Sequence, residues 1–80
     1  MTLEIMAFGI TKDIVGQTIF QLNVPSGSTV KELKETLVDK YPKIEELKSL
    51  LIAVNEEYGD EMHVLSERDE IALIPPVSGG

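Results

Sequence analysis

The residues with the clearest chemical potential stand at the end of the chain, where Pro75-Pro76 leads into Val77-Ser78-Gly79-Gly80. Two glycines without Cβ atoms can thread a narrow channel in another protein, and the proline pair stiffens the chain before them. A bare Gly-Gly can equally be a frayed end, but this setting favours an arm that presents the carboxyl group of Gly80. A carboxylate is a poor electrophile until it is adenylated. The chemistry therefore requires ATP and a partner enzyme.

No other group of side chains forms a recognisable site. His63 is the single histidine, and without a cysteine or an orienting partner we interpret it as structural or exposed. The crowded carboxylates lack EF-hand spacing, so we expect a solvated loop and no metal site: Glu56, Glu57, Asp60 and Glu61. Neither GxxxxGK[ST] nor GxGxxG occurs. We therefore expect no tightly bound cofactor and no enzyme activity of this chain alone, and ATP would be used by the partner.

Length and composition limit the function further. Eighty residues predict one domain, too small for a deep cleft lined by a full catalytic set. A net charge of −7 repels nucleic acid and favours a basic protein surface as partner, or simply keeps the domain soluble. Cysteine is absent and no apolar run approaches the length of a membrane span, so we expect a cytoplasmic protein that binds no membrane.

The elements that position the tail follow from hydrophobic periodicity. Alternating apolar residues predict strands over residues 2–8 and 19–24, joined as an antiparallel hairpin through a turn or short loop at 9–16. Thr29 and Glu32 form a capping box at the start of an amphipathic helix, which should stop near Tyr41 because Pro42 follows.

The second half is predicted in the same way. Pro42 begins a shorter helical segment whose apolar spacing continues to Leu51. A strand at 51–54, a turn or small hairpin at 55–59 and an apolar patch at 62–65 under the sheet follow. The segment 70–74 is apolar on both faces, which favours a central strand.

This order predicts an α+β fold: one mixed sheet, a helix across one face, and the last strand in the middle beside the first. We divide the chain into a domain at 1–76 and a tail at 77–80. If the face away from the helix is apolar, it is a docking patch. Met6, Phe8 and Leu73 are candidates, and the sequence does not settle which of them are exposed.

Several segments together resemble a known family, the MoaD family of molybdopterin synthase small subunits. The tail motif is the specific part of this resemblance, which extends over essentially the whole chain. The segments are Ala53-Val54-Asn55, Asp69-Glu70-Ile71-Ala72-Leu73-Ile74-Pro75-Pro76-Val77-Ser78-Gly79-Gly80, Ala7-Phe8-Gly9 to Val15-Gly16, and Val24-Pro25 to Leu37.

The resemblance implies a ubiquitin-like β-grasp fold and a sulfur carrier. An adenylating enzyme would activate Gly80, and a sulfurtransferase system would convert it to a thiocarboxylate. The large subunit would then take the sulfur for the pyranopterin precursor of the molybdenum cofactor. By position, Gly80 bears the sulfur, Gly79 gives clearance, and partner-binding residues are Phe8, Lys12, Pro75, Pro76, Val77 and Ser78.

One departure from the family pattern and two alternative functions stay open. Lys12-Asp13 stands where many members carry Arg-Glu, and a lysine cannot form the guanidinium fork. The chain could instead carry sulfur for another pathway, such as thiamin synthesis. It could also be a ubiquitin-like modifier that joins lysines through Gly80.

Overall fold

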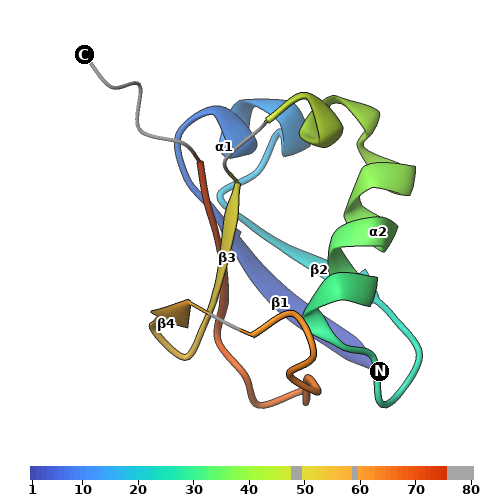
Figure 1. Ribbon diagram of the computed structural model, residues 1–80. Coiled ribbons are helices and arrows are strands. Elements are labelled where there is room, and N and C mark those ends of the chain that lie inside the picture. The colour runs from blue at the N-terminus through green and yellow to red at the C-terminus, as the bar shows by residue number, and fades with distance from the viewer. Residues whose placement is uncertain (48–49, 59, 76–80) are drawn as a thin grey trace.

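The computed structural model describes residues 1–47, 50–58 and 60–75. Within these residues one five-stranded sheet has the order β2-β1-β5-β3-β4, and α2 crosses one of its faces (Figure 1). The predicted α+β architecture is confirmed. The elements are β1 (Thr2–Ala7), α1 (Ile10–Val15), β2 (Ile19–Asn23), α2 (Val30–Lys40), η1 (Pro42–Glu46), β3 (Leu51–Val54), β4 (Glu57–Tyr58) and β5 (Ile71–Ile74).

The last strand lies in the middle of the sheet, as predicted. β5 runs parallel to β1, with Ile71 opposite Ile5, and antiparallel to β3, with Leu73 opposite Ile52. Ile71 and Leu73 are fully buried against the helix side. A strand with neighbours on both edges and apolar residues on both faces is well suited to this central position.

Helix α2 begins and ends where its sequence signals predict. The Glu32 N–H donates to Thr29 Oγ1 over 3.3 Å, and the Thr29 N–H donates to Glu32 Oε1 over 3.0 Å, which completes the capping box. The helix ends at Lys40, two residues before Pro42. Its buried stripe packs on the inner sheet face and consists of Val30, Leu33 and Leu37.

The segment predicted as a turn or short loop at 9–16 contains the short helix α1, so that prediction was wrong. Gly9 (φ 56°) and Gly16 (φ 86°) bracket the helix with backbone angles that favour glycine. Between them Thr11 is buried, while Ile14 and Val15 pack against the core. Six residues give too few turns for helical periodicity to stand out in the sequence.

Two further details differ from the sequence predictions. The second helical segment is the 3₁₀ helix η1, which ends at Glu46, so the spacing that continued to Leu51 was misleading. The strand predicted at 51–54 is confirmed as β3, and Leu51, its first residue, is exposed. In the segment predicted to pack under the sheet only Leu65 is buried, whereas Met62 and Val64 are exposed.

The predicted domain boundary between residues 76 and 77 lies outside the described residues and stays a prediction. Across the three described ranges, no helix is long and apolar enough to cross a membrane.

Candidate functional site

The sheet face away from α2 carries an apolar row that crosses every described strand. The register aligns Met6 with Ile19 on β2 and with Ala72 on β5. Ala72 pairs with Ala53 on β3, and Ala53 pairs with Tyr58 on β4. Exposure is greatest at the two ends, Ile19 and Tyr58. The outer face, as we name this side, is therefore apolar where a docking patch was predicted.

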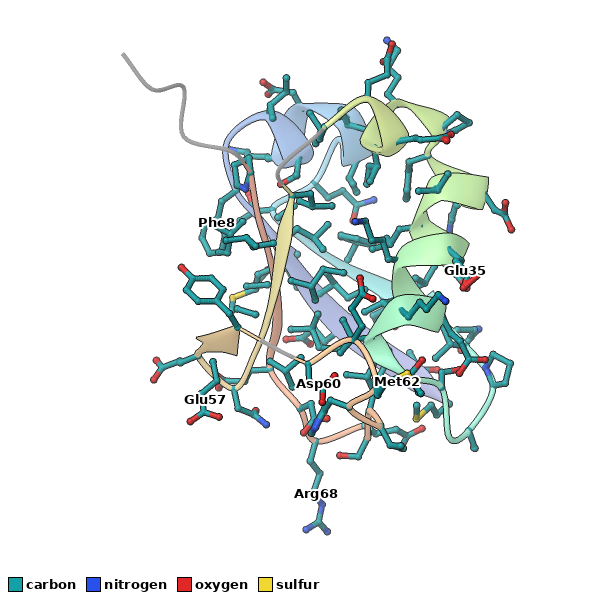
Figure 2. All side chains as sticks on the ribbon, viewed as in Figure 1. Phe8, Glu35, Glu57, Asp60, Met62 and Arg68 are labelled. Carbon is teal, nitrogen blue, oxygen red and sulfur yellow. The ribbon has the colours of Figure 1, made fainter. Side chains whose placement is uncertain are left out.

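A second apolar row lies one step closer to the tail. Leu51 pairs with Ile74. Phe8 directly follows Ala7, the last residue of β1, which pairs with Leu73. Figure 2 shows Phe8 on the side of the sheet opposite α2. Phe8 is 44% exposed, and it helps to line a hollow of about 290 Å³. The hollow is lined by Met6, Phe8, Ala53, Glu56, Tyr58, Glu70, Ala72 and Ile74.

The opposite end of the outer face is acidic. The parallel register places Glu4 beside Glu70, because the next residues along, Ile5 and Ile71, are partners. Together with Glu67 these two residues line a neighbouring hollow of about 250 Å³, where Arg68 is the cation. An apolar area bordered by carboxylates is complementary to a partner with an apolar ridge and basic flanks.

Pro75, which we call the base of the tail, packs against Gly9 in the segment that follows β1. Gly9 has φ 56° and ψ −131°, and a Cβ built on it would lie 3.0 Å from Pro75 Cγ. Thr11 Oγ1 accepts a hydrogen bond from the Phe8 N–H over 3.0 Å and lies 3.5 Å from the Leu73 carbonyl oxygen. Two predicted partner-binding residues, Phe8 and Pro75, are therefore brought close together.

The remaining predicted site residues are not part of this arrangement. Lys12 is exposed on α1 and does not line the outer-face hollows. Pro76, Val77, Ser78, Gly79 and Gly80 lie outside the described residues.

Asn55 is a structural residue of this region whose role the sequence analysis missed. Its N–H donates to Glu70 O over 2.8 Å, its Oδ1 accepts from the Glu70 N–H over 2.9 Å, and its Nδ2 donates to Asp69 Oδ1 over 3.0 Å. Asn55 (φ 53°) and Glu56 (φ 70°) form the two-residue turn between β3 and β4. Positive φ at both central residues is typical of a type I′ hairpin, which favours asparagine first.

Asp69 receives hydrogen bonds that stabilise its charged form. Burial raises the pKa of Asp69, but bonds from Asn55 and the Ser66 N–H, with the nearby His63, outweigh it and hold the pKa below its ordinary value. His63 Nε2 lies 3.7 Å from Asp69 Oδ2, and its side chain is 46% exposed. This agrees with the interpretation of His63 as structural or exposed.

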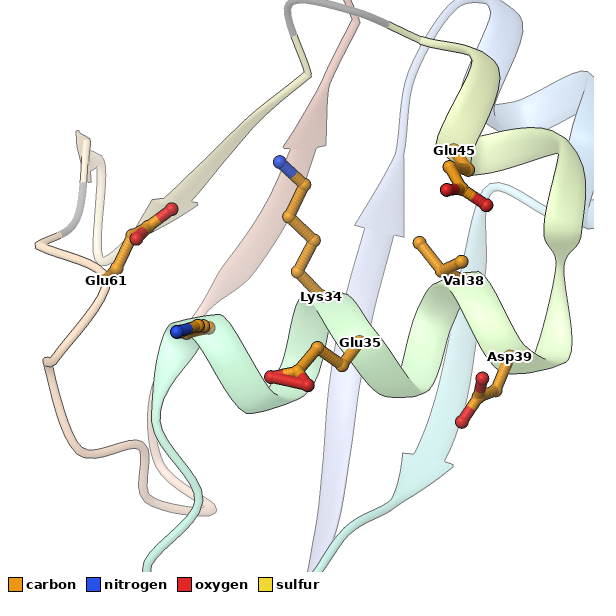
Figure 3. Close-up of a pocket in the computed structure, with 7 residues that line it drawn as sticks. Lys34, Glu35, Val38, Asp39, Glu45 and Glu61 are labelled. Atoms are coloured by element: carbon orange, nitrogen blue, oxygen red, sulfur yellow. The ribbon is translucent and has the colours of Figure 1, made fainter.

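The helix side has a larger hollow of about 450 Å³, which α2, η1 and Glu61 border (Figure 3). Its lining mixes both signs of charge and shares no residue with the outer-face hollows: Lys31, Lys34, Glu35, Val38, Asp39, Glu45 and Glu61. In the part of the chain that the structure describes, no group of three or more His, Cys, Asp or Glu side chains could hold a metal ion.

Solved structures share this architecture over nearly the whole chain. SAMP1, the small archaeal modifier protein 1 of Haloferax volcanii, is 25% identical with a TM-score of 0.84, and each chain is covered completely. In a Helicobacter pylori complex of subunits 1 and 2 of molybdopterin-converting factor, the matching chain is 31% identical with a TM-score of 0.68, again with complete coverage. A ubiquitin from Caldiarchaeum subterraneum, 17% identical over 100% of this chain and 98% of its own, shares the fold with a TM-score of 0.65.

Sequence comparison places the chain in a family. The ThiS family model matches residues 5–80. The Arabidopsis thaliana protein named molybdopterin synthase sulfur carrier subunit is 38% identical over 79 residues, which are 98% of this chain and 82% of the relative. The resemblance to molybdopterin synthase small subunits is confirmed, and this chain belongs to the ThiS family with a ubiquitin-like β-grasp fold.

Proposed function

We propose that the chain is the sulfur carrier subunit of a molybdopterin synthase and that the carboxyl group of Gly80 carries the sulfur. The observation that carries this proposal is the 38% identity, across almost the full chain, to a relative with that name. The geometry supports it, since the central strand β5 leads to Pro75 beside an apolar outer face. This arrangement suits a domain that docks on a partner and presents its end to it.

The chemistry proceeds in three steps, all on partner proteins. The Gly80 carboxylate attacks the α-phosphate of ATP on an adenylating enzyme, which releases pyrophosphate and leaves an acyl-adenylate. The outer sulfur of a persulfide on a sulfurtransferase attacks the acyl carbon and displaces AMP. A thiol then cleaves the S–S bond, which leaves the thiocarboxylate on Gly80 and a disulfide on the sulfur donor. The sulfur attacks a carbon of the pyranopterin precursor on the large subunit, and an oxygen substituent leaves as its bond to that carbon breaks. Water then cleaves the thioester and regenerates the carboxylate. We propose the cytoplasm as the location of these steps and no tightly bound cofactor on the chain itself.

The large subunit is the partner that we assign to the outer face. A Helicobacter pylori relative 31% identical to this chain was solved with a subunit 2 of molybdopterin-converting factor. Phe8 and its apolar neighbours supply the contact area, and the acidic end supplies charge complementarity.

Mass spectrometry tests the sulfur chemistry. The chain ending at Gly80, coexpressed with its adenylating enzyme and sulfurtransferase, should gain the mass of one oxygen-to-sulfur exchange, located at Gly80. Deletion of Gly79-Gly80 should abolish sulfur transfer but leave most docking on the large subunit. Full transfer activity without the two glycines would refute the proposal.

A second candidate function is protein modification, favoured by the similarity to the small archaeal modifier protein 1. In that case Gly80 would be found in isopeptide bonds to lysines in cell extracts. Complementation of a strain that lacks the small subunit separates the two roles, because a modifier alone would not restore molybdopterin synthesis.

A further inference from the structure

Thr11 is unusual because its side chain is completely buried on a short surface helix. It is one of two buried polar side chains among the described residues, the other being Ser28. A buried hydroxyl group must have hydrogen-bond partners, and those of Thr11 come from two different strand ends.

The first strand end is the exit from β1. The Phe8 N–H donates to Thr11 Oγ1 over 3.0 Å, and the Thr11 N–H donates to Phe8 O over 3.1 Å. Thr11 Oγ1 also lies 2.5 Å from Phe8 O. The N–H and the carbonyl oxygen of Phe8 are therefore both hydrogen-bonded to Thr11. These bonds fix the Phe8 backbone and so restrict where its exposed ring can lie.

The second strand end is the exit from β5. Thr11 Oγ1 lies 3.5 Å from Leu73 O, so its single hydrogen can serve either Leu73 O or Phe8 O. Two residues later, Pro75 packs against Gly9 of the same segment. The turn from Phe8 to Thr11 thus contacts the polypeptide immediately before the tail.

We infer that Thr11 is a positioning residue, which fixes Phe8 on the outer face relative to the base of the tail so that the partner engages both together. This inference rests on the proposed function. It extends that function by assigning a role to a buried hydroxyl that never touches the partner.

Substitution of the hydroxyl group gives a direct test, with affinity for the cognate large subunit measured by titration. Thr11→Val keeps the shape but leaves the Phe8 N–H without its partner, and we expect affinity to fall about tenfold. Thr11→Ser keeps the hydroxyl and should bind within about twofold of wild type. Should Thr11→Val not fold, Thr11→Ala takes its place.

A double-mutant cycle with Phe8→Ala separates positioning from general loss of structure. If Thr11 acts through Phe8, Thr11→Val should change affinity by less than about twofold in the Phe8→Ala background. Equal losses in both backgrounds, or a Thr11→Ser protein as weak as Thr11→Val, would overturn the inference. If the wild-type chain binds the large subunit and Thr11→Val binds it equally well, only the inference is overturned. If the wild-type chain does not bind the large subunit, the proposed function is overturned as well.

Discussion

Asn55 Nδ2 donates a hydrogen bond to Asp69 Oδ1 over 3.0 Å, and this contact joins the turn after β3 to the residue preceding Glu70 and β5. The backbone bonds between Asn55 and Glu70 lie directly beside it. Because β5 ends at the base of the tail, the contact fixes the strand that presents the tail at its opposite end.

The lowered pKa of Asp69 makes this contact dependent on pH. A group whose pKa is lower in the folded state stabilises the fold above its unfolded pKa, and the contribution is lost as pH falls through the folded value. Asp69→Asn should therefore cost about 1–2 kcal/mol in the free energy of unfolding at pH 7 and much less near pH 2. Urea denaturation at both pH values measures the difference.

The control for this prediction is the His63→Asn background, since His63 Nε2 also lies 3.7 Å from Asp69 Oδ2. The His63 side chain is 46% exposed, so its contact with Asp69 should contribute little and the effect of Asp69→Asn should persist there. A cost that is the same at both pH values would contradict the assigned role of the carboxylate.

Gly9→Ala should destabilise the protein more than a change at another glycine with positive φ. Alanine at Gly9 requires an unfavourable backbone conformation and also places its Cβ 3.0 Å from Pro75 Cγ. We expect a loss of roughly 2–3 kcal/mol in the free energy of unfolding. Gly16→Ala is the matched control, because Gly16 has φ 86° but no heavy atom within 4 Å of the position that a Cβ would take. It should cost about 1–2 kcal/mol, and equal losses would show that the Pro75 contact is unimportant.

How far the sequence predicts this fold depends on the length of each signal. The capping box at Thr29, the stop before Pro42 and the doubly apolar β5 are strong local signals, and the structure confirms all three. α1 was missed because six residues between two glycines carry no clear period. The strand at 51–54 was predicted with its correct bounds, although helical spacing also fits Leu51, the residue that begins it.

The candidate site was likewise predicted only in part from the sequence. Phe8 and Pro75 were proposed from family resemblance, and the structure places both at the base of the tail. The contacts of Thr11 with Leu73 and of Asn55 with Asp69 were not predicted, since each joins residues more than a dozen positions apart. Long-range hydrogen bonds of this kind depend on strand order, which a single sequence specifies only indirectly.

Glu56→Gly should stabilise the protein. Glu56 has φ 70°, a conformation that costs an L-residue about 1–2 kcal/mol and glycine nothing. The greater freedom of glycine in the unfolded chain offsets part of this gain, so we expect a net increase of about 0.5 kcal/mol in the free energy of unfolding. Glu57→Gly is the control, because Glu57 lies in strand β4. It should lower stability by about 0.5–1 kcal/mol, and a loss at both positions would contradict the strained-turn explanation.

Glu4→Gln and Glu70→Gln should slow association with the large subunit while leaving dissociation almost unchanged. Both carboxylates border the apolar part of the outer face, where they attract a basic partner before contact. Stopped-flow measurements at low salt should give a two- to fivefold slower association rate, and the difference should vanish near 0.5 M salt because the Debye length is then only about 4 Å. Glu35→Gln removes the same charge from α2, on the far side of the sheet (Figure 2), and should have a smaller effect. If all three variants slow association equally, net charge rather than the outer face steers the partner.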